Sequence, residues 1–406
     1  MLKSMNKWIF AAAMLGLICA SSFVSHEAWA GPQIAFGPDN EGLLQIDYKG
    51  QFQMTVRDTG ARPNQDDTTS QFNFRRNRLA FMGQYGETMS FYFQTEFTED
   101  QNITALGVSD TAGGSEFQVL DAVMRFTIHE AFRINVGKFK YNLSRENLED
   151  CFVPLTLDRS LFIRAPMTTT RDKGIAVWGN ILEGMLQYRI DAMNGRMPAT
   201  ADAPEPESNF RYSARAHVSL LEPETEYGYK GTYLGKKKVL TIGGAVQREA
   251  NVAYADTVTR SGQVNYTGST VDLFFEYPVG NGGAVTLSGA YENIDLEDAY
   301  LGAVPDPGAT GINGEKNGSY IKIGYLLPGG TIQLFGRHEK WSFASLQNVI
   351  NQKALWSAGG VNYYVRGQNL KLTLEHSRTD FDKEGVFNGT TSKDFVTTVA
   401  QLQFIF

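Results

Sequence analysis

Cysteine and histidine are scarce in this chain, and long apolar runs are missing from most of it. The 406 residues include two cysteines and five histidines, and no Cys-x-x-Cys-His motif occurs. A haem-binding or zinc-binding framework is therefore not expected, and we expect neither a cofactor nor a metal. Beyond residue 30, no run approaches the roughly 18 apolar residues that a membrane-spanning helix needs.

The amino-terminal thirty residues have the features of a secretory signal peptide. Lys3 and Lys7 precede an apolar stretch over residues 8–24, and Ala28 and Ala30 frame an A-x-A cleavage site. We therefore expect residues 1–30 to be removed, which leaves a single domain over residues 31–406. The formal charge of the full chain is -7, and the mature chain would be more acidic because the leader carries more lysines than carboxylates.

Neither cysteine is expected to form a disulfide or an anchor. Cys19 leaves with the signal peptide, and Ile18 is too large for the lipobox of a lipoprotein. Cys151 then has no partner in the exported chain, and we interpret it as a small apolar side chain.

Residues 44–57 alternate strictly between apolar and polar side chains. The even positions are Leu44, Ile46, Tyr48, Gly50, Phe52, Met54 and Val56, and every odd position is polar. Side chains alternate across a β-strand, so one face of this strand is apolar and the other polar. Soluble strands average about 5–6 residues, whereas a tilted membrane strand needs about 9–11. The length favours a membrane strand.

The same alternation recurs along the chain and predicts about sixteen strands, an even number as bacterial barrels require. Short connections alternate with long ones, as periplasmic turns alternate with external loops. Residues 250–269 are expected to be one of the long loops. A phase break at Arg75 and Arg76 predicts a bulge. Residues 222–237 form a long connection where a short turn is expected, and we find no explanation in the sequence.

The carboxyl-terminal segment is also amphipathic. Ala400, Leu402, Phe404 and the terminal Phe406 share one face. A last strand that ends in phenylalanine is the expected signal for the outer-membrane assembly machinery, so we expect an outer-membrane protein in contact with lipid. The fold class is therefore all-β, a transmembrane antiparallel barrel.

Residues 137–173 interrupt the alternation for longer than an ordinary connection lasts. The stretch is rich in cations: Lys138, Lys140, Arg145, Arg159, Arg164, Arg171 and Lys173. We interpret it as the third long loop, folded into the lumen as the pore constriction. The alternative is an external surface loop of mixed charge.

Seven segments in order resemble the phosphate-selective porin O/P family. They are FNFRRNRLAFMG (72–83), LDAVMRFTI (120–128), VGKFKYNLSREN (136–147), TRDKGIAVWG (170–179), YSARAHV (212–218), GGVNYYVRGQNLKLTLE (359–375) and QLQFIF (401–406). The resemblance implies a sixteen-strand, homotrimeric porin whose third external loop narrows the pore. It also implies an arginine ladder, which Arg75 and Arg76 fit, and a throat lined by lysines. Asn142 stands where the family usually has proline.

The resemblance and the basic stretch together predict passive diffusion of small anions such as phosphate, or of other small polar solutes. Arginine keeps its charge and binds phosphate bidentately, and charged rings at a constriction set selectivity. The candidate pore-lining residues are Arg75, Arg76, Lys138, Lys140, Arg159, Arg164, Arg171 and Lys173. No nucleic-acid partner is expected.

Alternative interpretations remain open at this stage. The expected inner faces also carry acids, namely Asp47, Glu96, Asp121, Asp191, Asp272, Glu276, Glu292, Glu339 and Glu375. Wall arginines such as Arg125, Arg189, Arg215 and Arg337 can therefore brace the wall instead of binding solute. The barrel could also be a scaffold that sheaths a partner such as a multihaem cytochrome conduit. An enzyme is not expected, because His217 and Ser219 share a face without a nucleophile elbow or an orienting acid.

Overall fold

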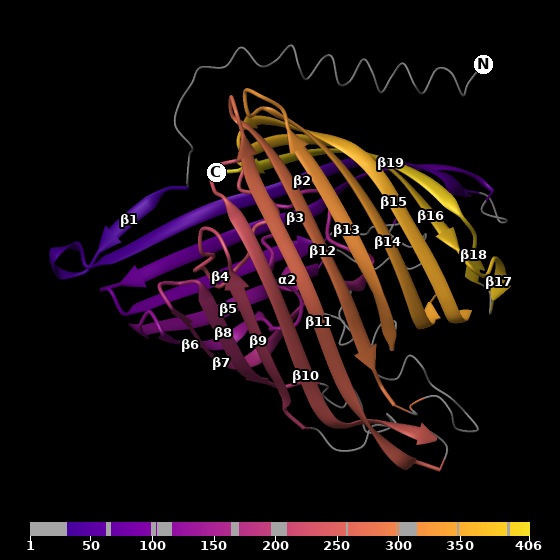
Figure 1. The fold of residues 1–406 in the computed structure, drawn as a ribbon, viewed down its shortest axis with the longest axis horizontal. Coiled ribbons are helices and arrows are strands. Elements are labelled where there is room, and N and C mark those ends of the chain that lie inside the picture. Colours follow the sequence, from indigo (N-terminus) through magenta and orange to yellow (C-terminus); the bar gives the residue numbers. More distant parts are fainter. Residues whose placement is uncertain are drawn as a thin grey trace.

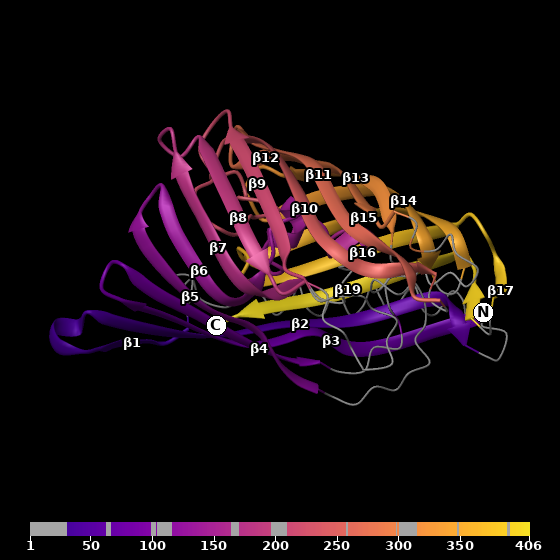
Figure 2. The same cartoon turned by 90° about the horizontal axis from the view of Figure 1, so that it is seen from below.

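Sixteen antiparallel strands form a closed barrel in the computed structural model (Figures 1 and 2). The structure describes residues 31–61, 66–98, 103, 116–163, 170–195, 209–256, 259–297, 299, 315–346, 349–387 and 390–406. Each strand pairs with its neighbours in sequence, and β19 returns to pair with β2, so the sheet has no free edge there. The prediction of a barrel of about sixteen strands is confirmed for the described residues.

The first eight barrel strands are β2 (Gly42–Ala61), β3 (Asp67–Tyr85), β4 (Met89–Thr98), β5 (Glu116–His129), β6 (Phe132–Lys140), β7 (Arg171–Ile181), β8 (Leu186–Met193) and β9 (Arg211–Ser219). The other eight are β10 (Val239–Asp256), β11 (Ser261–Val279), β12 (Gly283–Asp295), β13 (Lys316–Leu326), β14 (Ile332–Leu346), β15 (Val349–Arg366), β16 (Leu370–Phe381) and β19 (Phe395–Ile405).

The remaining elements are short. Strand β1 (Gln33–Phe36) pairs with the start of β2, and β17 (Gly385–Phe387) pairs with β18 (Thr390–Ser392). The helices are η1 (Pro38–Asn40), α2 (Arg145–Leu148) and η2 (Leu161–Ile163). None of the helices in the described part of the chain is long and apolar enough to span a membrane.

The two faces of the barrel wall differ sharply in composition. On the outer face Ile175 and Ile190 are more than half exposed, and on the inner face Gln187 and Glu292 are fully buried. This distribution follows from the alternation in the sequence, because successive side chains of a strand point to opposite faces. A polar interior and an apolar outer band are what a membrane barrel requires.

Two local predictions from the sequence, a bulge at Arg75 and Arg76 and a long loop over residues 250–269, can be compared with the structure. The register slips by one residue where Gln51 and Phe52 face Arg76 and Phe74, so Arg75 is the extra residue and the predicted bulge is confirmed. The prediction of a long loop over residues 250–269 is wrong. Strand β10 continues to Asp256 and strand β11 begins at Ser261. The two strands remain paired beyond a shift of register between Glu249 and Ala253.

Candidate pore constriction

The β6–β7 segment, residues 141–170 between strands β6 and β7, contains little regular structure in its described part. It is nevertheless almost completely buried from Tyr141 to Leu157. Irregular backbone can be buried only if its polar groups find partners. The partners here are side chains of the inner face of the barrel.

Inner-face side chains bond to the backbone of this segment from strands all around the wall. Donors to its carbonyl groups are Gln51 to Cys151, Arg215 and Thr270 to Leu143, Gln247 to Asn142, Lys316 to Phe162, Arg337 to Asp158 and Arg159, Asn362 to Leu155, and Gln403 to Phe152. Carboxylates that accept from its N–H groups are Asp191, Glu375 and Glu339.

Asn142, where the resemblance implies a proline, makes two hydrogen bonds at the start of the segment. Its backbone N–H donates to the Asp191 carboxylate at 3.1 Å, and its side-chain amide donates to the same oxygen at 2.6 Å. Proline lacks the N–H group and could make neither bond. The substitution therefore fixes the entry of the segment to strand β8.

Helix α2 is a single turn that carries two buried charges. Ser144 caps it by accepting from the Asn147 N–H at 3.1 Å. Arg145 forms a bidentate pair with Glu224 at 2.8 and 2.7 Å, and Glu146 pairs with Lys322 of strand β13. Both pairs are nearly inaccessible to solvent, so they hold the turn in one position.

The β9–β10 segment, residues 220–238, is the long connection that the sequence left unexplained. Tyr229 lies beside Glu149 in a parallel bridge, donating to the Leu148 carbonyl at 3.2 Å and accepting from the Asp150 N–H at 2.9 Å. The Gly231 N–H donates to the Val153 carbonyl at 2.9 Å. The segment is therefore joined backbone to backbone with the β6–β7 segment, which begins at the opposite end of the barrel.

Aromatic side chains of the β9–β10 segment receive wall cations. The Arg189 guanidinium lies 4.7 Å from the ring centre of Tyr227 and 4.6 Å from that of Tyr229. The Tyr229 hydroxyl meets Nδ1 of His217 at 2.7 Å and accepts from Arg215 at 3.2 Å. His217, which was considered as part of an enzyme site, therefore supports the segment.

A group of cations surrounds Cys151 in the β6–β7 segment. Burial raises the pKa of the Cys151 thiol, but Arg159, Lys140, Arg76 and Arg78 outweigh that effect and lower the pKa well below its ordinary value. We call these four residues the cation cluster. Contacts also place these residues beside the segment: Lys140 donates to the Glu149 carbonyl, and the Arg78 guanidinium lies 5.6 Å from the ring centre of Phe152.

The members of the cation cluster are unevenly neutralised. Arg78 pairs with Glu96 at 2.7 Å, and Arg76 pairs with Asp158 at 2.8 Å. Among the described residues, the Lys140 ammonium donates to the Glu149 carbonyl oxygen at 2.5 Å, and Arg159 donates to the Glu146 carbonyl oxygen at 3.5 Å. Within the described residues neither of these two cations has a carboxylate at ion-pair distance. The cluster therefore carries a net positive charge.

Two further cations predicted for the pore lie beside the cluster. Arg75, on the bulge of β3, shares Asp158 with Arg76 at 2.7 Å, and those two arginines lower the pKa of Asp158 well below its ordinary value against the effect of burial. Arg171 pairs with Asp121 at 3.0 Å. The structure thus brings together Arg75, Arg76, Lys140, Arg159 and Arg171. It adds Arg78, which follows Arg76 by two residues but was not among the residues predicted from the sequence.

The structure places two other predicted residues elsewhere. Lys138 and Lys173 face each other across β6 and β7, on the row that continues from Val136 and Ile175 of the outer face. Lys173 is exposed and Lys138 is half-buried. Arg164 lies outside the described residues.

The wall arginines divide into two kinds. Arg215 pairs with Asp272 at 2.6 Å, and Arg337 pairs with Glu339 at 3.0 Å, as expected for residues that brace the wall. Arg125 and Arg189 instead lie against tyrosine rings. No cluster of three or more side chains suited to a metal ion occurs in the described residues.

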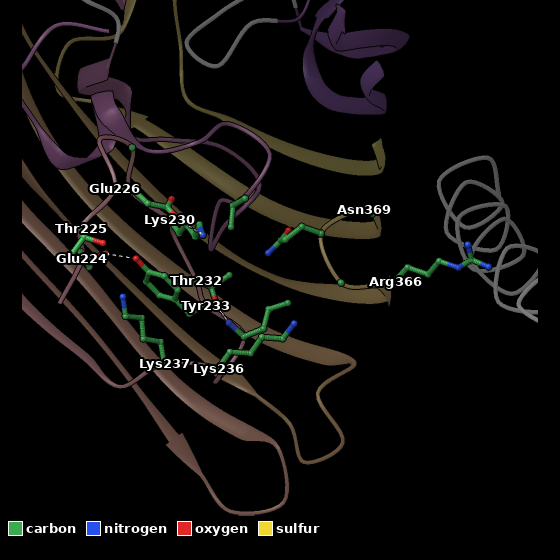
Figure 3. A pocket seen from close by; sticks show the side chains of 15 residues that line it. Glu224, Thr225, Glu226, Lys230, Thr232, Tyr233, Lys236, Lys237, Arg366 and Asn369 are labelled. Atoms are coloured by element: carbon green, nitrogen blue, oxygen red, sulfur yellow. Dashed lines mark hydrogen bonds and ion pairs between the residues drawn. The ribbon is translucent and has the colours of Figure 1, made fainter. Parts of the chain in front are cut away.

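Two cavities border the joined segments. One of about 520 Å³ is lined by the β9–β10 segment and by the β15–β16 turn, and its lining includes Lys230, Lys236 and Lys237 as well as Glu224 and Glu226 (Figure 3). Tyr233 and Glu224 meet at 2.6 Å on its wall. A second cavity of about 120 Å³ is lined by Arg57, Arg75, Asp158 and Glu375, among others. The first cavity is lined by four basic and two acidic side chains, and the second by two of each.

A closed barrel of this strand number, with a polar interior and an apolar outer band, defines an outer-membrane porin. The family model "Phosphate-selective porin O and P" matches residues 46–406, and the chain belongs to this family. It is therefore a channel protein of the outer membrane and not an enzyme.

Two solved structures resemble the fold at low sequence identity. OmpF of Salmonella typhi in complex with daunomycin has a TM-score of 0.59 and 12% identity, and the match covers 92% of this chain and 100% of that one. An anion-selective porin from Comamonas acidovorans has a TM-score of 0.55 and 9% identity, with 90% and 100% covered. No curated protein is significantly similar in sequence.

Proposed function

We propose that this porin passes small anions, phosphate among them, through a constriction formed by the β6–β7 segment. The observation that carries the proposal is the cation cluster, in which Lys140 and Arg159 lack a carboxylate partner among the described residues. Guanidinium and ammonium groups bind phosphate through charge-assisted hydrogen bonds. The family description is consistent with the same solute.

The position of a few cations at the constriction explains how they can set the ion selectivity of a chain that is acidic overall. A charge beside a narrow, low-dielectric passage acts through a focused field, whereas charges in wide vestibules are screened within about 8–10 Å in physiological salt. Most acids of the inner wall are also engaged, as Asp272, Glu339 and Glu96 are by arginine. The partly neutralised cations therefore set the preference of the passage for anions.

The two joined segments favour a channel over a scaffold barrel. A barrel that sheaths a partner protein needs an unobstructed interior, and here inner-face side chains of strands around the wall bind the β6–β7 segment. We further propose that the mature chain begins at Gly31, assembles as a homotrimer, and is inserted by machinery that reads the terminal Phe406.

The test is reversal potential in a salt gradient, measured on purified protein in a planar bilayer. Lys140→Gln and Arg159→Gln should each reduce the preference for anions, and the double variant should reduce it further. Lys340→Gln removes an exposed lysine of the outer face and serves as the matched control. If the double variant keeps the reversal potential and phosphate conductance of the wild type, the cation cluster does not set selectivity.

A further inference from the structure

Lys138 and Lys173 are a pair of like charges on the outer wall of the barrel. They are direct register partners across strands β6 and β7. Lys138 also faces Ala122 of strand β5, and the next row toward the short turns consists of Met124, Val136 and Ile175, all of which are exposed. The two ammonium groups therefore stand at one margin of the apolar band.

No carboxylate within the described residues forms an ion pair with either lysine, and the nearby Asp121 pairs with Arg171. The Lys138 ammonium donates to the Val119 carbonyl at 2.7 Å. The neighbouring acid, Asp172, uses its two oxygens to accept from the backbone N–H groups of Lys173 at 2.7 Å and Gly195 at 2.8 Å. Like charges directly opposite each other destabilise a sheet, and an anion that bridges the two ammonium groups would relieve this repulsion.

The position of the two lysines in the membrane indicates which class of anion they would meet. The connections at the other end of β6 and β7 are short turns, which face the periplasm in barrels of this class. The lysines lie near the opposite ends of their strands and hence at the outer leaflet. Lysine side chains extend from an apolar surface to reach the headgroup level, and clustered basic residues bind anionic headgroups there.

We propose that Lys138 and Lys173 together bind the phosphate group of a phosphorylated lipid of the outer leaflet. The acyl chains of that lipid lie along the apolar row of Met124, Val136 and Ile175. A free phosphate ion would lack this apolar contact, so the site takes a lipid. The inference rests on the membrane placement of the barrel and is independent of the anion passage proposed above.

The experiment compares thermal unfolding of the barrel, followed by heat-modified gel mobility, in two kinds of vesicle. One contains phosphatidylcholine alone, and the other also contains diphosphorylated lipid A. Wild type, Lys138→Gln, Lys173→Gln, the double variant and the control Lys340→Gln are measured in each. Retained lipid A per barrel is counted by mass spectrometry after extraction into detergent.

We expect the substitutions to shift the unfolding temperature in opposite directions in the two kinds of vesicle. In phosphatidylcholine, either single variant should unfold at the same temperature as wild type or slightly above it, because repulsion is relieved. In lipid A the same variants should unfold below wild type and retain lipid A roughly fivefold more weakly per lysine removed. Lys340→Gln should follow wild type in both, and all variants should keep the wild-type conductance.

Three outcomes would overturn the proposal. Equal retention of lipid A by the double variant and wild type would show that the pair binds no lipid phosphate. Stabilisation of wild type by inorganic phosphate to the same extent as by lipid A would assign the site to the free ion. A changed reversal potential in Lys138→Gln or Lys173→Gln would return the lysines to the pore. If the double variant fails to fold, the single variants decide.

Discussion

Arg145 and Glu224 form a two-pronged ion pair that ties the β6–β7 segment to the β9–β10 segment, with both side chains at most 2% exposed. Arg145 also lies 4.0 Å from the ring centre of Phe274 and donates to the Lys230 carbonyl at 3.2 Å. A single side chain thus connects two segments that begin at opposite ends of the barrel.

Replacing Arg145 with methionine should destabilise the barrel markedly. Removing one partner leaves a buried, unpaired carboxylate, at a cost of about 3–5 kcal/mol. Arg378→Ala, which breaks an exposed pair, should leave the unfolding midpoint nearly unchanged. Equal midpoints for Arg145→Met and wild type would show that the pair does not hold the segments together.

Lowering the pH should reduce the difference in unfolding midpoint between Arg145→Met and wild type. Although burial raises it, pairing with Arg145 lowers the pKa of Glu224 from 4.5 to about 2. The stabilisation from a depressed carboxyl pKa is present above 4.5 and is lost as the pH falls through about 2. Unfolding midpoints between pH 6 and 2 should therefore converge, and parallel curves would contradict the assignment.

The anion preference should increase below neutral pH. Burial, with the neighbouring Glu146 carboxylate, raises the pKa of Glu149 from 4.5 to about 7. Glu149 therefore gains a proton as the pH falls through that value, and the constriction becomes more positive. Glu149 and Glu224 affect the free energy of unfolding in opposite directions as the pH changes. The contribution of Glu149 to stability declines as the pH rises from 4.5 to 7. Reversal potentials should shift in wild type but not in Glu149→Gln.

Replacing residues 224–235 with a short glycine-serine turn should raise the single-channel conductance. The change removes Tyr229 and Tyr233 together with the contacts that join the two segments. Lys236→Gln keeps those contacts and serves as the control for altered charge in the same cavity. A folded, heat-modifiable variant with unchanged conductance would show that the β9–β10 segment does not narrow the path.

Charges at the carboxyl terminus should block assembly. Phe406 exchanges backbone hydrogen bonds with Tyr48 at 2.6 and 3.0 Å, and the Phe404 ring lies 5.7 Å from that of Tyr48. Changing Phe404→Asp and Phe406→Asp together should abolish folded protein in outer-membrane fractions. A lipid-facing charge costs roughly 2–4 kcal/mol at the midplane and less near the interface, so the main loss is recognition. Leu182→Asp, in an exposed turn, should insert normally.

The barrel was predictable from the sequence because alternation reports directly on which face of a strand is buried. Residues 44–57 were expected to form a strand, and all of them lie within β2. The phase break at Arg75 was also visible, because an inserted residue reverses the alternation.

The site was only partly predictable, because side-chain direction depends on register near strand ends. Lys138 and Lys140 looked equivalent in a basic stretch, yet Lys138 lies on the outer row and Lys140 reaches the Glu149 carbonyl. The β9–β10 segment has no periodic pattern, and its main partner, Arg145, is 79 residues away from Glu224. Only the folded chain brings these residues together.

Closure of the barrel by β19 and β2 also constrains the order of folding. Gln51 and Gln403 share a hydrogen bond at 2.8 Å although 352 positions separate them in the chain. Contacts between distant residues form slowly, because the entropy of closing the intervening chain must be overcome first. Until β19 has been synthesised, β2 keeps an open edge that invites pairing with other molecules. The nascent protein therefore depends on being kept apart from its neighbours until the last strand arrives.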